Sequence, residues 1–247
     1  MNPENPFGRT SSQYQRWRPR YPAELFDHLA SLCPSPEQAW DCATGNGQAA
    51  IDLARYFLQV EATDVSAEQI AAATPSVRVH YSVQPAESTK FPDAHFDLIT
   101  VAQALHWFEH DRFWKEVHRV LRPKGIFAAW AYVWPQVTPA IDAIVKMKLR
   151  NVLHGYWSER NRIAWNGYRE LEWPFVELPS PQIGFSCDWT CNQFLSYVRT
   201  WSATTRCIDA NGDGFFTEFT EALRTVWNEN TTKTVRMDFH CRLGRKG

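Results

Sequence analysis

A glycine-containing turn between an apolar run and a helical pattern is the feature that most constrains the fold of this chain. The apolar run ends at Asp41, the turn 42–47 carries two glycines, and apolar residues then recur at helical spacing over 48–58. This order predicts a strand, a tight turn and a helix. A further helix, with proline near its first turn, is expected at 22–32.

The alternation of strands and helices continues along the chain. A second strand is expected at 57–63 and leads to Asp64. The elements expected next are a helix at 66–73, strands at 77–82 and 96–102, a helix at 111–121, a turn at 122–125 and a strand at 126–131. Strands that alternate with helices imply a parallel sheet covered by helices on both faces, so the fold class is α/β.

The second half of the chain has weaker periodicity. The tripeptide 133–135 contains a proline and is expected to end the preceding strand. Helices are expected at 138–153, 191–203 and 215–228, and one or two edge strands at 232–243. The stretch 173–190 is rich in proline and aromatic residues and shows no clear period.

Charge and aromatic content indicate the kind of partner. The chain has 26 Lys and Arg against 27 Asp and Glu, a formal net charge of −1. Such a balance produces no field that would concentrate a polyanion, so we expect no nucleic-acid partner. The 12 Trp, 15 Phe and 8 Tyr suit an aromatic-lined pocket for a small molecule.

Cysteine spacing and hydropathy indicate whether to expect a metal site, disulfides or a membrane location for this protein. The six cysteines form no CxxC pair, so we expect neither a metal site nor a disulfide framework. The N-terminal residues lack the basic and apolar regions of a signal peptide, and no apolar run is long enough to span a membrane. A cytoplasmic protein without a membrane partner is therefore expected. Its oligomeric state is left open.

Acidic residues around the glycine turn distinguish between two cofactor classes. The pattern G-x-G-x-x-A that starts at Gly45 matches a dinucleotide fingerprint and allows an NAD-dependent oxidoreductase. Asp41 would repel the pyrophosphate of a dinucleotide, whereas it would attract the ammonium and sulfonium of S-adenosylmethionine. Asp64 can hold a ribose diol at the end of the second strand, and Glu87 can accept a hydrogen bond from an adenine amino group. These residues favour S-adenosylmethionine.

Several segments resemble one family. They are D-x-A-x-G-x-G from Asp41, the acid Asp64, the pair Ala86-Glu87, the stretch 96–108 (FDLITVAQALHWF), the stretch 119–125 (RVLRPKG) and the N-terminal segment 14–22. Residues 14–131 are thereby similar to class I S-adenosylmethionine-dependent methyltransferases, within them to the small-molecule group of trans-aconitate methyltransferase-like proteins. The resemblance implies a Rossmann-like, doubly wound, mostly parallel sheet of about seven strands, the last antiparallel, with a helical cap.

The resemblance also implies roles for individual residues. Two of them, His106 and Trp107, would be catalytic residues that face the reactive methyl, with His106 as the candidate base for a hydroxyl or amine acceptor. The acceptor would be a small anionic or aromatic molecule, methylated at a carboxyl or hydroxyl oxygen. The cofactor-binding residues would be Tyr14, Arg18, Asp41, Ala43, Gly45, Gly47, Asp64, Val65, Glu87 and Gln103.

We expect one methyltransferase domain over residues 1–247. Within it, the expected parts are an N-terminal lid and helix at 1–35, a cofactor-binding core at 36–132, a cap and acceptor region at 133–205, and a C-terminal helix with edge strands at 206–247.

Two residues depart from the family pattern. Ala43 and Lys124 stand where the family often has glycine. Alanine is compatible with the turn if the backbone at that position does not need a positive φ. Because of Ala43, a third hypothesis stays open, a protein that binds the cofactor without turnover.

The stretch 209–221 resembles a calcium-binding loop. It follows the pattern D-x-[DN]-x-[DN]-G, but Thr220 stands at the twelfth position, where the loop needs a bidentate glutamate. Loss of two ligand oxygens and a charge predicts a connection between two helices and not a metal site.

Overall fold

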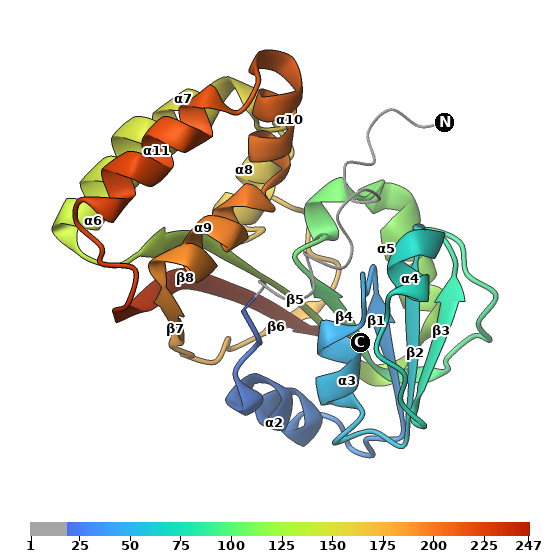
Figure 1. Cartoon of the computed structure of the whole chain (residues 1–247). Helices are drawn as coiled ribbons and strands as arrows, with labels where there is room; N and C mark the ends of the chain where they lie inside the picture. Colours follow the sequence, from blue (N-terminus) through green and yellow to red (C-terminus); the bar gives the residue numbers. More distant parts are fainter. Residues whose placement is uncertain (1–18) are drawn as a thin grey trace. The chain divides into compact units, whose positions relative to one another are not determined.

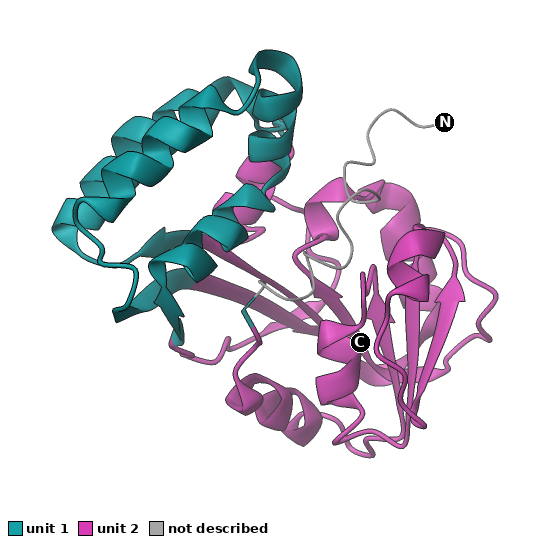
Figure 2. Ribbon diagram, in the orientation of Figure 1, with its two compact units in different colours: residues 1–19, 134–159, 185–238 teal, residues 20–133, 160–184, 239–247 magenta. Residues whose placement is uncertain are grey.

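The computed structural model describes residues 19–247 and divides the chain into two compact units. Unit 1 contains Trp134–Glu159 and Phe185–Asp238, and unit 2 contains Arg20–Val133, Arg160–Gly184 and Phe239–Gly247 (Figure 2). Tyr14, Arg18 and most of the predicted N-terminal lid lie outside the described residues. A single domain with a cap at 133–205 stays a prediction.

An eight-stranded mixed sheet organises the chain (Figure 1). Its strand order is β3-β2-β1-β4-β5-β8-β6, with β7 paired to β8. The pairs among β1 to β5 are parallel, whereas β6 and β7 each run antiparallel to β8. The strands are β1 Gln38–Cys42, β2 Gln59–Asp64, β3 Val79–Val83, β4 Phe96–Ala102, β5 Leu121–Gln136, β6 Val176–Leu178, β7 Phe185–Thr190 and β8 Thr232–Arg245. The predicted α/β, Rossmann-like class is confirmed.

In unit 2 the parallel strands have apolar side chains on both faces. Side chains of successive strand residues point to opposite faces, so Ala39 and Trp40 of β1 belong to different core clusters. The cluster of Ala39 includes residues of helices α2 Ala23–Ser31 and α3 Gln48–Leu53. The cluster of Trp40 includes residues of α5 His110–Val120. A short helix, α4 Ala67–Ala71, follows β2. Helices on both faces bury the sheet, as the alternating pattern predicted.

Unit 1 is mostly helical. Its helix α11 packs against α6 and against η2, the π-helical stretch that continues α6. Its helices are α6 Pro139–Ile144, η2 Val145–Arg150, α7 Asn151–Leu153, η3 His154–Tyr156, α9 Cys191–Arg199, α10 Ser202–Asn211 and α11 Gly214–Arg224. The calcium-like stretch lies mainly within α10 and α11, with 212–213 as the connection, so these residues do not form an extended ligand loop.

The predicted end of the fifth strand at Pro135 is wrong. Strand β5 runs from Leu121 to Gln136. The pairing of β4 with β5 ends at Ala102 opposite Trp130, so Pro135 lies beyond the part of β5 whose amides face β4. Proline is tolerated where one side of a strand needs no donor.

Two further differences concern short segments. The expected turn at 122–125 is an irregularity inside β5: Leu121 pairs with Phe96, Ile126 pairs with Leu98, and Lys124 between them has a φ of 64°. The stretch 173–190, for which no element was expected, contains β6 and β7. Both are short strands that pair only with β8, which explains why they lack a continuous apolar run.

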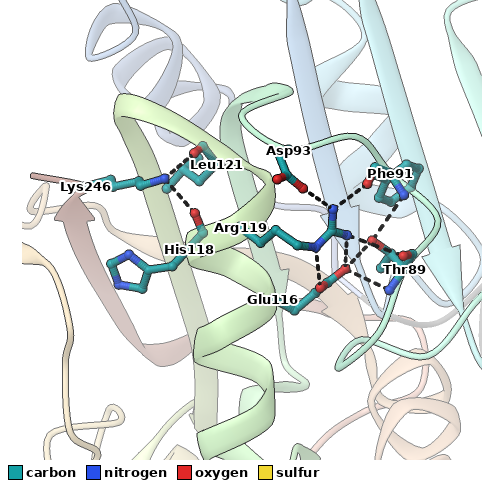
Figure 3. A network of polar contacts seen from close by, with 8 residues as sticks. All are labelled: Thr89, Phe91, Asp93, Glu116, His118, Arg119, Leu121 and Lys246. Atoms are coloured by element: carbon teal, nitrogen blue, oxygen red, sulfur yellow. Dashed lines mark hydrogen bonds and ion pairs between the residues drawn. The ribbon is translucent and has the colours of Figure 1, made fainter.

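An ionic network around the buried Glu116 holds the loop after β3 against α5 (Figure 3). Glu116 of α5 accepts a hydrogen bond from the backbone N–H of Thr89 at 2.7 Å. Arg119 donates to Glu116 and to Asp93, each at 2.7 Å. Lys246 caps the end of the same helix by donating to the carbonyls of His118 and Leu121. The network fixes a loop that also carries Glu87.

Candidate functional site

Asp41 lies at the end of β1 and is only 1% exposed. Its carboxylate accepts hydrogen bonds from the hydroxyls of Thr44 at 2.5 Å and Thr100 at 2.9 Å. Burial raises the pKa of Asp41 to about 6, while these two hydrogen bonds act in the opposite direction. Because it is ionised at neutral pH, Asp41 is a fixed negative charge beneath the glycine turn.

Asp64 joins the turn after β1 to the turn after β2. One carboxylate oxygen accepts from the N–H of Gly45 and the other from the N–H of Ser66, both at 2.9 Å. Burial raises the pKa of Asp64, and the backbone donors of Ser66, Gly45 and Val65 oppose that rise. A carboxylate has about four acceptor positions, so these three donors leave one for a further hydrogen bond, and the side chain is half-buried. Asp64 can therefore still accept a hydrogen bond from a ligand.

The turn after β1 has three left-handed residues. Gly45 has a φ of 57° and Gly47 a φ of 88°. A Cβ on Gly47 would collide with the phenol ring of Tyr81, which adds to the preference for glycine at this position. Ala43 has a φ of 54°, which does not meet the condition under which alanine was expected to be compatible with the turn. An L-residue in this region is strained by about 1–2 kcal/mol.

Apolar side chains are exposed at the ends of β2 and β3. Val65 is 65% exposed and Val83 is 53% exposed. Val83 pairs with Asp64 across the two parallel strands. The half-buried Glu87 lies four residues after Val83 and accepts a hydrogen bond from the N–H of Glu109 at 3.1 Å. An apolar surface beside a carboxylate can bind the face and the amino edge of a purine.

The turn after β4 contains Gln103 and the 3-10 helix η1 Leu105–Trp107. Gln103 has a φ of 60°, and its side-chain amide donates to the carbonyl of Tyr132 at 3.1 Å. His106 is 4% exposed, and burial, followed by the nearby charges of Arg160 and His110, lowers its pKa to about 3. Its imidazole is thus neutral at physiological pH and a poor proton acceptor.

Several residues of the site had no sequence signal. The side-chain nitrogen of Asn46, which is 4% exposed, has no hydrogen-bond partner among residues 19–247. Thr44, in the turn after β1, and Thr100, in β4, both donate hydrogen bonds to Asp41. Asn46 lies between the two glycines of the predicted motif, so its place in the turn was visible in the sequence, whereas its unsatisfied donor was not.

These groups fit a ligand with one nucleoside and one charged amino-acid end. The turn 43–47 has two left-handed glycines and one side-chain donor, that of Asn46, without a hydrogen-bond partner among residues 19–247. Asp41 and Asp64 supply negative charge there, which favours a cationic ligand over a pyrophosphate. Within residues 19–247, no cluster of three His, Cys, Asp or Glu side chains could hold a metal ion.

Comparisons with known proteins agree with this geometry. Residues 40–129 match the methyltransferase domain family. A solved structure named as a type II methyltransferase of Anaeromyxobacter dehalogenans is 40% identical, with a TM-score of 0.85, and the match covers 92% of this chain and 97% of that one. The chain belongs to the class I S-adenosylmethionine-dependent methyltransferases. Its cofactor is S-adenosylmethionine, and the NAD-dependent oxidoreductase that the glycine pattern alone allowed is excluded.

Two curated relatives support the assignment of this chain to the methyltransferases. A protein of Dictyostelium discoideum named as a methyltransferase is 29% identical over 242 residues, which cover 96% of this chain and 92% of the relative. A protein of Saccharomyces cerevisiae named as an S-adenosylmethionine-dependent methyltransferase is 23% identical and covers 79% of each chain.

The strain at Ala43 generates a stability prediction. Ala43→Gly is expected to raise the free energy of unfolding by about 1 kcal/mol in urea denaturation, because glycine adopts a positive φ without a Cβ clash. Lys124→Gly, at a φ of 64°, should change stability in the same direction. Ala54→Gly, at a φ of −63°, should destabilise instead. Equal effects of all three substitutions would contradict the assignment of strain to Ala43.

The buried charge of Asp41 generates a pH prediction. The folded pKa of about 6 lies above the ordinary value of 3.8, so ionisation of Asp41 lowers the stability of the wild type as pH rises from about 4 to 6. Asp41→Asn lacks that loss. Between pH 4 and pH 7 its stability relative to the wild type should increase by up to about 3 kcal/mol, at about 1.4 kcal/mol per unit. Chemical denaturation at both pH values measures this, with the exposed Asp209→Asn as control; a pH-independent difference would contradict it.

Proposed function

We propose that this methyltransferase transfers the methyl group of S-adenosylmethionine to a small anionic acceptor, at a carboxyl or hydroxyl oxygen. The cofactor brings a methyl group already activated on a sulfonium. The carboxylate of Asp64 would hold the ribose hydroxyls, Val65 and Val83 would contact the adenine face, and Glu87 would accept from the adenine amino group. The turn at Ala43, Gly45 and Gly47 would surround the methionine end, with Gln103 near it. The roles of Tyr14 and Arg18 over the cofactor stay predictions.

The observation that supports the acceptor class is a guanidinium in unit 1, that of Arg150, whose pKa is lowered by burial and partly raised again by the charge of Asp238. The guanidinium of Arg150, the last residue of the π-helical stretch η2, lies 3.9 Å from the ring centroid of Trp134. Among the described carboxylates none forms an ion pair with it. A guanidinium stacked on an aromatic ring keeps its in-plane donors available for a carboxylate.

A cavity and an aromatic cluster surround that cation. The cavity has a volume of about 270 Å³, and Trp134, Val145, Arg150 and Asp238 are among the residues that line it. Trp134 also packs against Trp157 and Trp201, with ring centroids 5.6–5.9 Å apart within the trio. A volume of this size suits a small organic molecule, and π-helical stretches are frequent at functional sites.

The low basicity of His106 favours a carboxylate over a hydroxyl acceptor. A carboxylate already carries the attacking lone pair, so the chain needs only to align it, exclude water and shield its charge. A hydroxyl must lose a proton, and the pKa of about 3 makes His106 a weak acceptor for it. In this proposal His106 and Trp107 shape the site beside the reacting atoms without moving a proton.

Other features of the proposal rest on the sequence. A relation to trans-aconitate methyltransferase-like proteins would match an acidic acceptor, and a cytoplasmic location stays a prediction. None of the helices within residues 19–247 has the length and apolar character needed to cross a bilayer.

The strained Ala43 favours one alternative, a protein that binds the cofactor without turnover. A misplaced turn would weaken alignment of the methyl group more than binding itself, because alignment depends on sub-ångström placement. Detection of methyl transfer to any acceptor would exclude this alternative.

Asp64 is the residue on which cofactor binding should depend most. Asp64→Asn is expected to weaken the binding of S-adenosylhomocysteine by about 30-fold, because it removes the charge from a hydrogen bond to the ribose worth about 1.5–3 kcal/mol. Isothermal calorimetry measures the dissociation constant, and thermal unfolding checks that the variant is folded. Asp52→Asn on α3, where Asp52 pairs with Arg55, is the control. Unchanged binding by the folded Asp64 variant would contradict the proposed site.

Arg150 should determine acceptor affinity. With a panel of small mono- and dicarboxylates that includes trans-aconitate, methyl transfer is expected to at least one member, and Arg150→Met should raise its KM by about 10-fold or more. Lys148→Met, on the same helical stretch and paired with Glu218, should leave KM unchanged. Transfer that proceeds equally well in both variants would contradict the anionic acceptor site.

A further inference from the structure

Arg160 starts the segment Arg160–Gly184, which belongs to unit 2 although the chain before and after it belongs to unit 1. Its guanidinium donates to the carbonyl of Trp107 at 2.6 Å and to the carboxylate of Glu109 at 3.1 Å. These two acceptors flank Phe108, where η1 ends and α5 is about to begin. The guanidinium of Arg160 thus hydrogen-bonds both ends of the connection between η1 and α5.

The same connection also contacts the loop after β3. The N–H of Glu109 donates to the carboxylate of Glu87 at 3.1 Å. Arg160, Glu109 and Glu87 therefore form a continuous chain of hydrogen bonds between the turn after β4 and the loop after β3. Both segments lie at the carboxyl ends of parallel strands, where ligands bind in open α/β sheets.

The turn after β4 needs such external support. A three-residue 3-10 helix satisfies few of its own carbonyls, and those at its end must find other donors. The ring of His110 hydrogen-bonds the carbonyl of Leu105 at 3.0 Å, and Arg160 supplies the donor for Trp107. The buried ring of Tyr168, from the same segment as Arg160, stacks at 6.5 Å from the ring of His106.

The ion pair alone does not explain the position of Arg160. The side chain of Arg160 is 43% exposed and that of Glu109 is 66% exposed, so solvent screens their attraction. The hydrogen bond to the Trp107 carbonyl is the shorter contact, and it requires the fork geometry of a guanidinium, because one planar group must meet a carbonyl and a carboxylate at once.

We propose that Arg160 is a positioning residue that fixes the turn Leu105–Trp107 and, through Glu109, the loop that carries Glu87. The roles of these two segments toward the acceptor and adenine rest on the proposed function. Arg160 acts through its hydrogen bonds to Trp107 and Glu109, which hold these two segments in place relative to each other.

The test compares Arg160→Ala with Arg162→Ala in the full chain. Arg162 lies two residues further along, in α8 Asn161–Trp165, and pairs with Glu170 on the surface. Arg160→Ala should weaken S-adenosylhomocysteine binding by about 3- to 10-fold and speed amide hydrogen exchange over 104–110 by about 10-fold, with the unfolding temperature unchanged relative to Arg162→Ala. Arg160→Lys, which restores the charge without the fork, should leave exchange fast.

A double-mutant cycle tests the route through Glu87. Glu87→Ala combined with Arg160→Ala should bind S-adenosylhomocysteine no more weakly than Glu87→Ala alone. Additive losses, or an Arg160 variant identical to the Arg162 variant, would overturn the proposal. If the wild type binds no S-adenosylhomocysteine, the proposed function fails, and hydrogen exchange over 104–110 still decides the role of Arg160: unchanged exchange in Arg160→Ala would overturn it.

Discussion

The carboxylate of Asp64 is the contact on which the arrangement of the site depends. It accepts from Gly45, which lies 19 residues earlier in the turn after β1, and from Ser66 in the turn after β2, so a single side chain sets the distance between the two turns. Both donors are backbone groups that a turn cannot satisfy internally. These hydrogen bonds form without a ligand, and they fix the orientation of the Asp64 carboxylate toward the ligand side.

The site keeps two carboxylates where burial disfavours their charge. Burial raises the pKa of both Asp41 and Asp64. Hydroxyl and N–H donors reduce this penalty but leave the charges in place, and no basic side chain forms an ion pair with either among the described residues. A positively charged ligand is attracted by these two negative charges, whereas a pyrophosphate would be repelled.

The sequence predicts those parts of the molecule whose physics is local. Apolar runs bounded by turn residues predicted β1, β2, β3 and β4 to within two or three residues. The runs are nearly continuous in β1 and β4, because these two strands are buried on both faces. The end of β5 was predicted too early because the compatibility of Pro135 with a strand depends on where the neighbouring strand β4 ends. The positive φ of Ala43 and the low pKa of His106 were not predictable, since the first depends on the hydrogen bonds of the whole turn and the second on burial. Arg160 was missed because its partners lie about 50 residues earlier.

Hydrogen exchange of the wild-type chain with and without S-adenosylhomocysteine tests the central claim most directly, because it locates the cofactor without any substitution. We expect slower amide exchange on binding in three segments, 42–47, 64–66 and 84–89, which follow β1, β2 and β3. Binding that protects none of these segments would contradict the placement of the cofactor at the carboxyl ends of these strands.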